Sequence, residues 1–137
     1  MKYLVTGGAG FIGSNFIKLL LAERPEAYVV NLDALTYAGH LESLADISDD
    51  PRYSFLHGDI CDAELVDAAM EGVDVVFNLA SDSPVDRSIV EAIPFVRTNV
   101  LGTATLLAAA CACAVSYTHL RAHETDSYLV CRLLLEK

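Results

Sequence analysis

TGGAGFIGS, at residues 6–14, is the stretch that decides the fold of this chain. The apolar run at residues 3–5 before it predicts a β-strand, and the apolar-rich run at residues 15–22 after it predicts a helix. A strand, a glycine-rich turn and the start of a helix form the first half of a dinucleotide-binding βαβ unit. The loop by itself could also be an ordinary strand-to-helix turn.

Three glycines in this stretch have distinct expected tasks. Gly7 lets the chain turn sharply out of the strand, and Gly10 has no Cβ, so a pyrophosphate can approach the backbone there. Gly13 lets the helix pack tightly against the sheet. The free N–H groups and the positive end of the helix dipole then face the phosphates.

An acidic residue follows the next predicted strand, at about residues 28–32. Asp33 stands 20 residues after Gly13, the approximate offset at which an acid accepts hydrogen bonds from the adenosine ribose. No Lys or Arg lies between Asp33 and Arg52 to offset the charge of a 2′-phosphate. We therefore expect NAD, rather than NADP, as the cofactor.

Composition limits the functional classes that fit. The 137 residues suffice for one domain, and 53% of them are hydrophobic, as in a globular protein. No apolar run approaches ~18 residues, so no membrane span is expected. The net charge of −10 argues against nucleic acid and anionic membranes as partners. We expect a cytoplasmic location, reduced cysteines and no metal site, because no C-x-x-C pair or Cys-His cluster occurs.

Apolar runs and helical patterns alternate along the chain, which predicts an α/β fold with a parallel sheet. Asp62 is expected to cap a helix that Gly72 ends, and Pro94 to open a long helix. We predict an incomplete Rossmann-type doubly wound sheet with helices on both faces. The predicted strands lie at about 2–6, 28–32, 53–57 and 73–79, and the helices at about 11–22, 41–46, 63–70 and 94–112.

Five segments together resemble one enzyme family. They are residues 6–14, NLDALTYAGHLESL at 31–44, HGDICD at 57–62, VDRSI at 85–89 and TNVLGT at 98–103. Residues 1–113 resemble the N-terminal part of the dTDP-glucose 4,6-dehydratases, within the extended short-chain dehydrogenase/reductase superfamily. The glycine motif is shared across that superfamily, whereas LDALTYAG with VDRS is much narrower.

The resemblance implies binding roles on the adenosine side of NAD. Phe11 and Ile12 would offer backbone N–H groups to the pyrophosphate, and Asp33, with Leu35 and Thr36, would hold the ribose. Tyr37 could either cover this loop or touch the ligand.

Further positions are implied around the rest of the ligand. Asp59 and Ile60 would flank the adenine, although Asp59 could simply cap a strand end. Ser83 would approach the sugar nucleotide, or be an ordinary loop hydroxyl, and Thr98 would shape the cofactor pocket. Three consecutive residues would lie under the nicotinamide: Leu79, Ala80 and Ser81.

One segment departs from the family pattern. Where the family usually reads L-A-A-E-S-H-V-D-R-S, residues 79–88 read LASDSPVDRS. The acid is shortened to Asp82, and Pro84 replaces a histidine and removes a backbone donor. We therefore expect substrate contacts at this segment to differ in detail from those of the family.

The family's catalytic residues do not occur in these 137 residues. The family oxidises the sugar at C4, eliminates water across C5 and C6, and returns the hydride to C6. This chemistry needs a Tyr-x-x-x-Lys pair and an Asp-Glu pair. None of the six tyrosines has Lys four residues later, and no adjacent Asp-Glu pair exists. We predict no catalytic residue, and an inactive NAD-binding portion of an enzyme that acts on dTDP-glucose as a homodimer when complete.

The tail does not resemble the family. Residues 115–137, VSYTHLRAHETDSYLVCRLLLEK, match the translation of a transposase-type sequencing adapter with a short variable index. We therefore divide the chain into a truncated NAD-binding Rossmann portion, 1–114, and a non-native tail, 115–137, and expect the fifth strand of the native sheet to be missing. A diverged natural tail is the other interpretation.

Two other functions stay open. A UDP-sugar 4-epimerase or decarboxylase would share the glycine loop, although LDALTYAG followed by VDRS fits these enzymes less well. A non-catalytic NAD-sensing protein would also lack Tyr-x-x-x-Lys.

Overall fold

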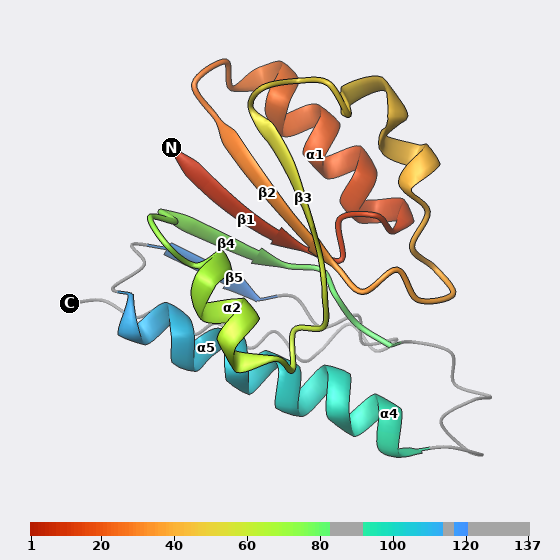
Figure 1. Ribbon diagram of the computed structural model, residues 1–137, viewed down its shortest axis with the longest axis vertical. Helices are drawn as coiled ribbons and strands as arrows, with labels where there is room; N and C mark the ends of the chain where they lie inside the picture. Colours follow the sequence, from red (N-terminus) through yellow and green to blue (C-terminus); the bar gives the residue numbers. More distant parts are fainter. Residues whose placement is uncertain (83–91, 114–116, 121–137) are drawn as a thin grey trace, which may run out of the picture.

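The computed structural model describes residues 1–82, 92–113 and 117–120, and it contains one parallel sheet (Figure 1). The strand order is β3-β2-β1-β4-β5, so the chain moves outward from β1 in one direction and then in the other. This is the expected doubly wound Rossmann arrangement. The strands are β1 Lys2–Thr6, β2 Tyr28–Asp33, β3 Tyr53–His57, β4 Val75–Asn78 and β5 Tyr117–Leu120.

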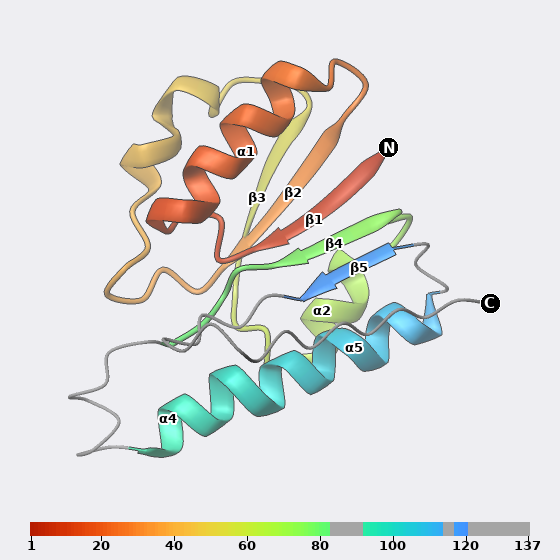
Figure 2. The same cartoon turned by 180° about the vertical axis from the view of Figure 1, so that it is seen from behind.

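Helices cover both faces of the sheet, as predicted. Figures 1 and 2 show α1, Phe11–Glu23, on one face, and α2, Ala63–Ala69, with α5, Thr103–Ala112, on the other. The 3₁₀ segment η1, Leu41–Ile47, packs against α1. Towards its N-terminus α5 continues into η2, Arg97–Gly102, and α4, Ala92–Val96, so that these three segments form one long helix.

Two hydrophobic cores result, because successive strand residues point to opposite faces. Leu4 packs with residues of α2 and α5, including Val66 and Leu106, while Val5 packs with α1 through Ile17. All five of these residues are at most 2% exposed. The β1 strand is therefore buried on both sides, as expected for the central strand of a parallel sheet.

The ends of two helices test the expected signals. The Asp62 side chain accepts a hydrogen bond from the Leu65 N–H at 3.2 Å and caps α2, as predicted. The sequence predicts that the long helix begins at Pro94. In the structure it begins two residues earlier, at Ala92. A proline is tolerated at position 94 because N–H groups in the first turn have no partner within the helix.

Arg52 joins the end of α1 to the turn before β3. Its guanidinium donates to the carbonyl oxygens of Leu21 at 3.0 Å and Pro25 at 3.3 Å, and it pairs with Asp50 at 2.7 Å. The hydrogen bonds from Arg52 hold the pKa of the Asp50 carboxyl below its usual value. The last turn of α1 is thus closed by a side chain from a distant part of the chain.

The fifth strand comes from the tail and was not expected. Residues 117–120 pair in parallel with β4, with Val75 opposite Tyr117. The free edge of β4 offers unpaired backbone groups to any extended segment, and Tyr and Thr favour extended structure. Any extended segment near this edge could pair with β4, so the pairing does not show whether the tail is native.

Candidate dinucleotide-binding site

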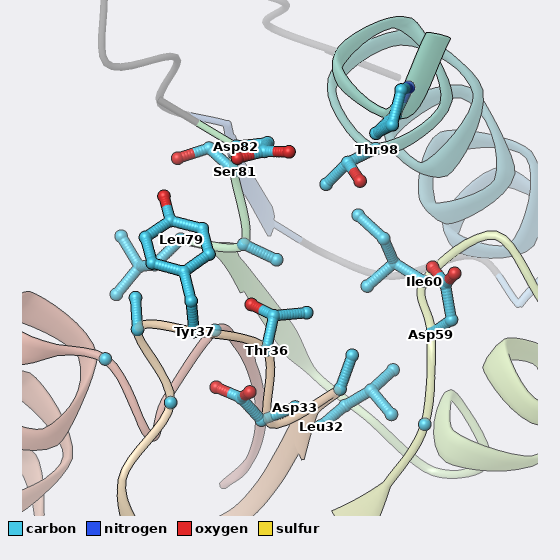
Figure 3. A pocket seen from close by; sticks show the side chains of 18 of the residues that line it. Leu32, Asp33, Thr36, Tyr37, Asp59, Ile60, Leu79, Ser81, Asp82 and Thr98 are labelled. Atoms are coloured by element: carbon cyan, nitrogen blue, oxygen red, sulfur yellow. The ribbon is translucent and has the colours of Figure 1, made fainter. Parts of the chain in front are cut away.

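A cavity of about 380 Å³ opens at the carboxyl ends of β1, β2, β3 and β4 (Figure 3). In doubly wound sheets this edge, where the strand order reverses, is where ligands bind. The long helix closes the cavity through Pro94, Phe95 and Thr98. The cavity therefore gathers residues from five separate parts of the chain.

The glycine turn passes very close to the segment after β4. Gly7 has φ +68°, and a Cβ there would stand 2.6 Å from the Ala80 nitrogen. A Cβ at Gly13 would overlap the Gly7 carbonyl oxygen and would come within 2.6 Å of the Gly8 Cα. Glycine is thus required at 7 and 13 for the turn and the close packing that the motif predicted.

The start of α1 is open to an anion. Gly10 precedes the helix without a side-chain cap, and no acidic residue occupies the first turn. Acidic residues line the cavity at Asp33, Asp59 and Asp82, whereas no Lys, Arg or His lies among the described lining residues. Phosphates would therefore be held by backbone N–H groups and the helix dipole rather than by side-chain cations.

Asp33 ties the glycine turn to the loop after β2. One carboxylate oxygen accepts the Ala9 N–H and the other accepts the Leu35 N–H, both at 2.8 Å. Leu35 has φ +50°, a left-handed conformation that this second bond stabilises. Because each carboxylate oxygen can accept two hydrogen bonds, Asp33 keeps capacity for ribose hydroxyls.

Asp59 stabilises the turn after β3 and also lines the cavity. Its carboxylate accepts the Cys61 N–H at 2.9 Å and pairs with Arg97 at 3.5 Å, while Asp59 also lines the cavity. Burial raises the pKa of the Cys61 thiol, so this cysteine stays protonated at neutral pH and is a poor nucleophile.

A polar network holds the segment after β4. Thr6 Oγ1 bonds to the Asn78 side-chain oxygen, and Asn78 Nδ2 donates to Thr103 Oγ1 at 3.4 Å. The Ala80 N–H donates to the same Thr6 hydroxyl at 3.4 Å. Thr6 and Asn78 are buried, so the network fixes the backbone under one end of the cavity.

The structure brings most of the sequence-predicted residues to this cavity. Phe11 and Ile12 are exposed at the helix start outside the lining, Gly13 packs beneath the turn, and Leu35 contributes its N–H to Asp33. Ser83 lies outside the described residues. Those that line the cavity are Gly7, Gly10, Asp33, Thr36, Asp59, Ile60, Leu79, Ala80, Ser81 and Thr98.

Two further polar residues line the cavity: Tyr37, for which the sequence left ligand contact and loop covering open, and Asp82, which the sequence marked as a departure from the family pattern. Tyr37 lines the cavity, and in Figure 3 its hydroxyl end points toward Ser81 and Asp82. Asp82 lies at the end of the segment after β4, with Ser81 and Thr98. The rule that carboxyl-end loops of parallel strands meet at one edge could have placed both there.

Comparisons with known proteins identify relatives of this chain. A family model described as GDP-mannose 4,6 dehydratase matches residues 4–127. A low-salt glycan biosynthesis protein from Haloferax volcanii is 57% identical over 110 residues, which are 80% of this chain and 35% of that protein. A dTDP-glucose 4,6-dehydratase from Shigella flexneri is 53% identical over 112 residues, or 80% of this chain and 31% of that enzyme.

Solved structures agree with the relatives in sequence. A dTDP-glucose 4,6-dehydratase from Streptomyces venezuelae, solved with NAD bound, has a TM-score of 0.82 and 49% identity over 86% of this chain and 38% of that one. A UDP-glucose 4-epimerase from Thermotoga maritima has a TM-score of 0.76 and 30% identity over 86% of this chain and 36% of that one. The chain spans about a third of the length of the curated relatives from Haloferax volcanii and Shigella flexneri.

Gly7→Ala tests the close approach of the turn to Ala80. Gly72 has a similar φ of +67° with nothing within 4 Å of its Cβ position, so Gly72→Ala is a matched control. Gly72→Ala should lower the free energy of unfolding by about 1–2 kcal/mol through backbone strain alone. Gly7→Ala should lower the free energy of unfolding by about 1–3 kcal/mol more than Gly72→Ala does, roughly the cost of overpacking. Urea denaturation of both variants measures this difference. Equal losses would contradict the steric account.

Proposed function

Because this chain belongs to the GDP-mannose 4,6 dehydratase family, we propose that it is the NAD-binding portion of a nucleotide-sugar 4,6-dehydratase that acts on dTDP-glucose. The observation that carries the proposal is the cavity at the strand ends, where the glycine turn meets Asp33 and Asp59 at the ends of β2 and β3. About 50% identity to dTDP-glucose 4,6-dehydratases supports the substrate.

The residues present fit NAD. The glycine turn and the start of α1 would hold the pyrophosphate, and Asp33 would bind the adenosine ribose. NADP fits less well, because its 2′-phosphate would meet Asp33 with no cation in the described lining. The guanidinium of Arg52 cannot offset that charge, since Asp50 and two backbone carbonyls already hold it.

The enzyme's reaction would need groups beyond these residues. In a complete dehydratase, NAD would accept the hydride from sugar C4 and return it at C6. The chain's own residues would hold the cofactor, but it has no Tyr-x-x-x-Lys pair and no adjacent Asp-Glu pair to move protons. We therefore propose that these 137 residues bind NAD without turning over a sugar nucleotide.

The comparisons favour a dehydratase over an epimerase. The dehydratase structure from Streptomyces venezuelae shares 49% identity with this chain, against 30% for the epimerase from Thermotoga maritima. A non-catalytic NAD-sensing protein would predict the same cavity. It would be distinguished by a complete gene that lacks Tyr-x-x-x-Lys.

Asp33→Asn tests cofactor binding. Whichever way the amide is oriented, its NH₂ group faces one of the backbone N–H groups of Ala9 and Leu35, which the carboxylate now accepts. We expect NAD to bind about 10- to 100-fold more weakly, as for loss of hydrogen bonds to a charged group. Isothermal titration calorimetry measures this, with the exposed Asp49→Asn as control. No NAD binding by the unsubstituted chain would refute the proposed function.

Residues 115–137 are, in our proposal, not part of the native protein. The match of residues 115–137 to an adapter translation supports this. The alignments with the relatives from Haloferax volcanii and Shigella flexneri extend over 110 and 112 residues, while the match of the family model runs on to residue 127. Resequencing the locus from an independently prepared library should give a frame that continues past codon 114 without this tail. It should encode an Asp-Glu pair and Tyr-x-x-x-Lys. A frame that keeps the tail would refute both the proposal that residues 115–137 are not native and the proposal that the protein is an enzyme.

We propose that the complete protein is a homodimer through the long helix. One face of this helix packs on the core through Leu106, while Ile93, Val96 and Val100 are 58–81% exposed. A row of exposed apolar side chains on an ordered helix is typical of a protein interface.

By length and composition alone, Ala92–Ala112 could also cross a membrane. The expectations of no membrane partner, no nucleic-acid partner and a cytoplasmic location stay predictions.

Val100→Asp in the full-length protein tests the interface. A carboxylate buried against a second copy would be desolvated without a partner, so we expect a monomer in analytical ultracentrifugation. Leu19→Asp is the matched control, because Leu19 is 59% exposed on α1, on the opposite face of the sheet. A dimer that persists in Val100→Asp would rule out this surface.

A further inference from the structure

Asp82 lines the cavity and carries a buried carboxylate oxygen without a hydrogen-bond partner in the described part of the chain. Among the described side chains, two buried polar atoms lack a hydrogen-bond partner, Asp82 Oδ1 and Asn31 Oδ1. The Asn31 oxygen faces Gly8, and Asn31 does not line the cavity, whereas Asp82 does. Buried polar atoms in folded proteins nearly always have a partner, whereas the charge of the Asp82 carboxylate has no hydrogen-bond donor among the described residues at Oδ1 to offset it.

The main chain at Asp82 is held in place by Asn99. The Asp82 N–H donates to Asn99 Oδ1 and the Asn99 amide donates to the Asp82 carbonyl oxygen, both at 2.9 Å. Asn99 lies in the π-helical segment η2, and such local departures from the α-helix are frequent at functional sites. The reciprocal pair fixes the backbone from which the Asp82 carboxylate projects.

The strand order says which half of a dinucleotide this carboxylate would meet. The glycine turn follows β1, while Asp33 and Asp59 follow β2 and β3 on one side of it. If these hold the pyrophosphate and adenosine, the other nucleoside lies beside the residues after β4. Figure 3 shows Asp82 there, with Ser81 and Thr98, at the opposite end of the cavity from Asp33.

We propose that Asp82 selects the oxidation state of the bound cofactor, an inference that rests on the proposed NAD site. The nicotinamide ring carries a positive charge when oxidised and none when reduced. No basic side chain among the described lining residues competes for the Asp82 carboxylate. Because opposite charges attract, the carboxylate therefore stabilises the oxidised form relative to the reduced form. Asp82 thereby keeps the site loaded with the form that can oxidise a sugar.

Asp82→Asn in the 137-residue chain tests this proposal. The substitution keeps the size and one acceptor oxygen but removes the charge. Calorimetry should give dissociation constants for oxidised NAD, reduced NAD and ADP-ribose, which lacks the nicotinamide. We expect oxidised NAD to bind about tenfold more weakly, as for loss of one partly shielded charge pair. Reduced NAD and ADP-ribose should change less than about twofold on the same electrostatic grounds.

A matched substitution and the three ligands separate the outcomes. Asp67→Asn makes the same charge change at an exposed position on α2 and should alter none of the three constants. Equal weakening of oxidised and reduced NAD would mean that Asp82 only positions the loop, and would overturn the proposal. Unchanged constants, or an equal loss for ADP-ribose, would also overturn it. If the unsubstituted chain bound no NAD, the proposed function itself would fail, and this inference with it.

Discussion

The contact between the turn after β1 and the segment after β4 is the constraint on which the site depends. The absence of a side chain at Gly7 lets the Ala80 backbone lie against the turn. The Thr6 hydroxyl then reaches the Ala80 N–H, and Asn78 extends the same network to α5. Hydrogen bonds consequently join the ends of the two central strands, β1 and β4, beside the cavity.

Backbone groups at this end of the sheet explain how a strongly acidic chain can present an anion site. Three carboxylates and no described cation line the cavity. Backbone N–H groups and a helix dipole attract an anion through partial charges. Unlike Lys or Arg side chains, they add no full positive charge to the site. The carboxylates can therefore act at the two ends of a ligand, where hydroxyls or a positive ring would need acceptors. What a ligand meets at each point of the cavity therefore depends on where the three carboxylates lie, and not on the net charge of the chain.

Much of the fold and part of the site could be predicted from the sequence because the signals are local. The glycine spacing, Asp33 after an apolar run, and the Asp62 cap each involve residues close together in the chain. The reciprocal bonds between Asp82 and Asn99 join residues 17 positions apart and leave no local pattern. The close approach of Gly102 to Ile60 likewise joins residues 42 positions apart in the chain. The pairing of β5 depends on an available strand edge rather than on a motif.

Arg52 gives the first half of the fold a temporal order. The carbonyl groups of Leu21 and Pro25 are reached by a guanidinium that follows them by about thirty residues. During synthesis, α1 and β2 therefore emerge before the group that completes their junction. The Arg52 hydrogen bonds that close this junction therefore form only after the turn before β3 has left the ribosome.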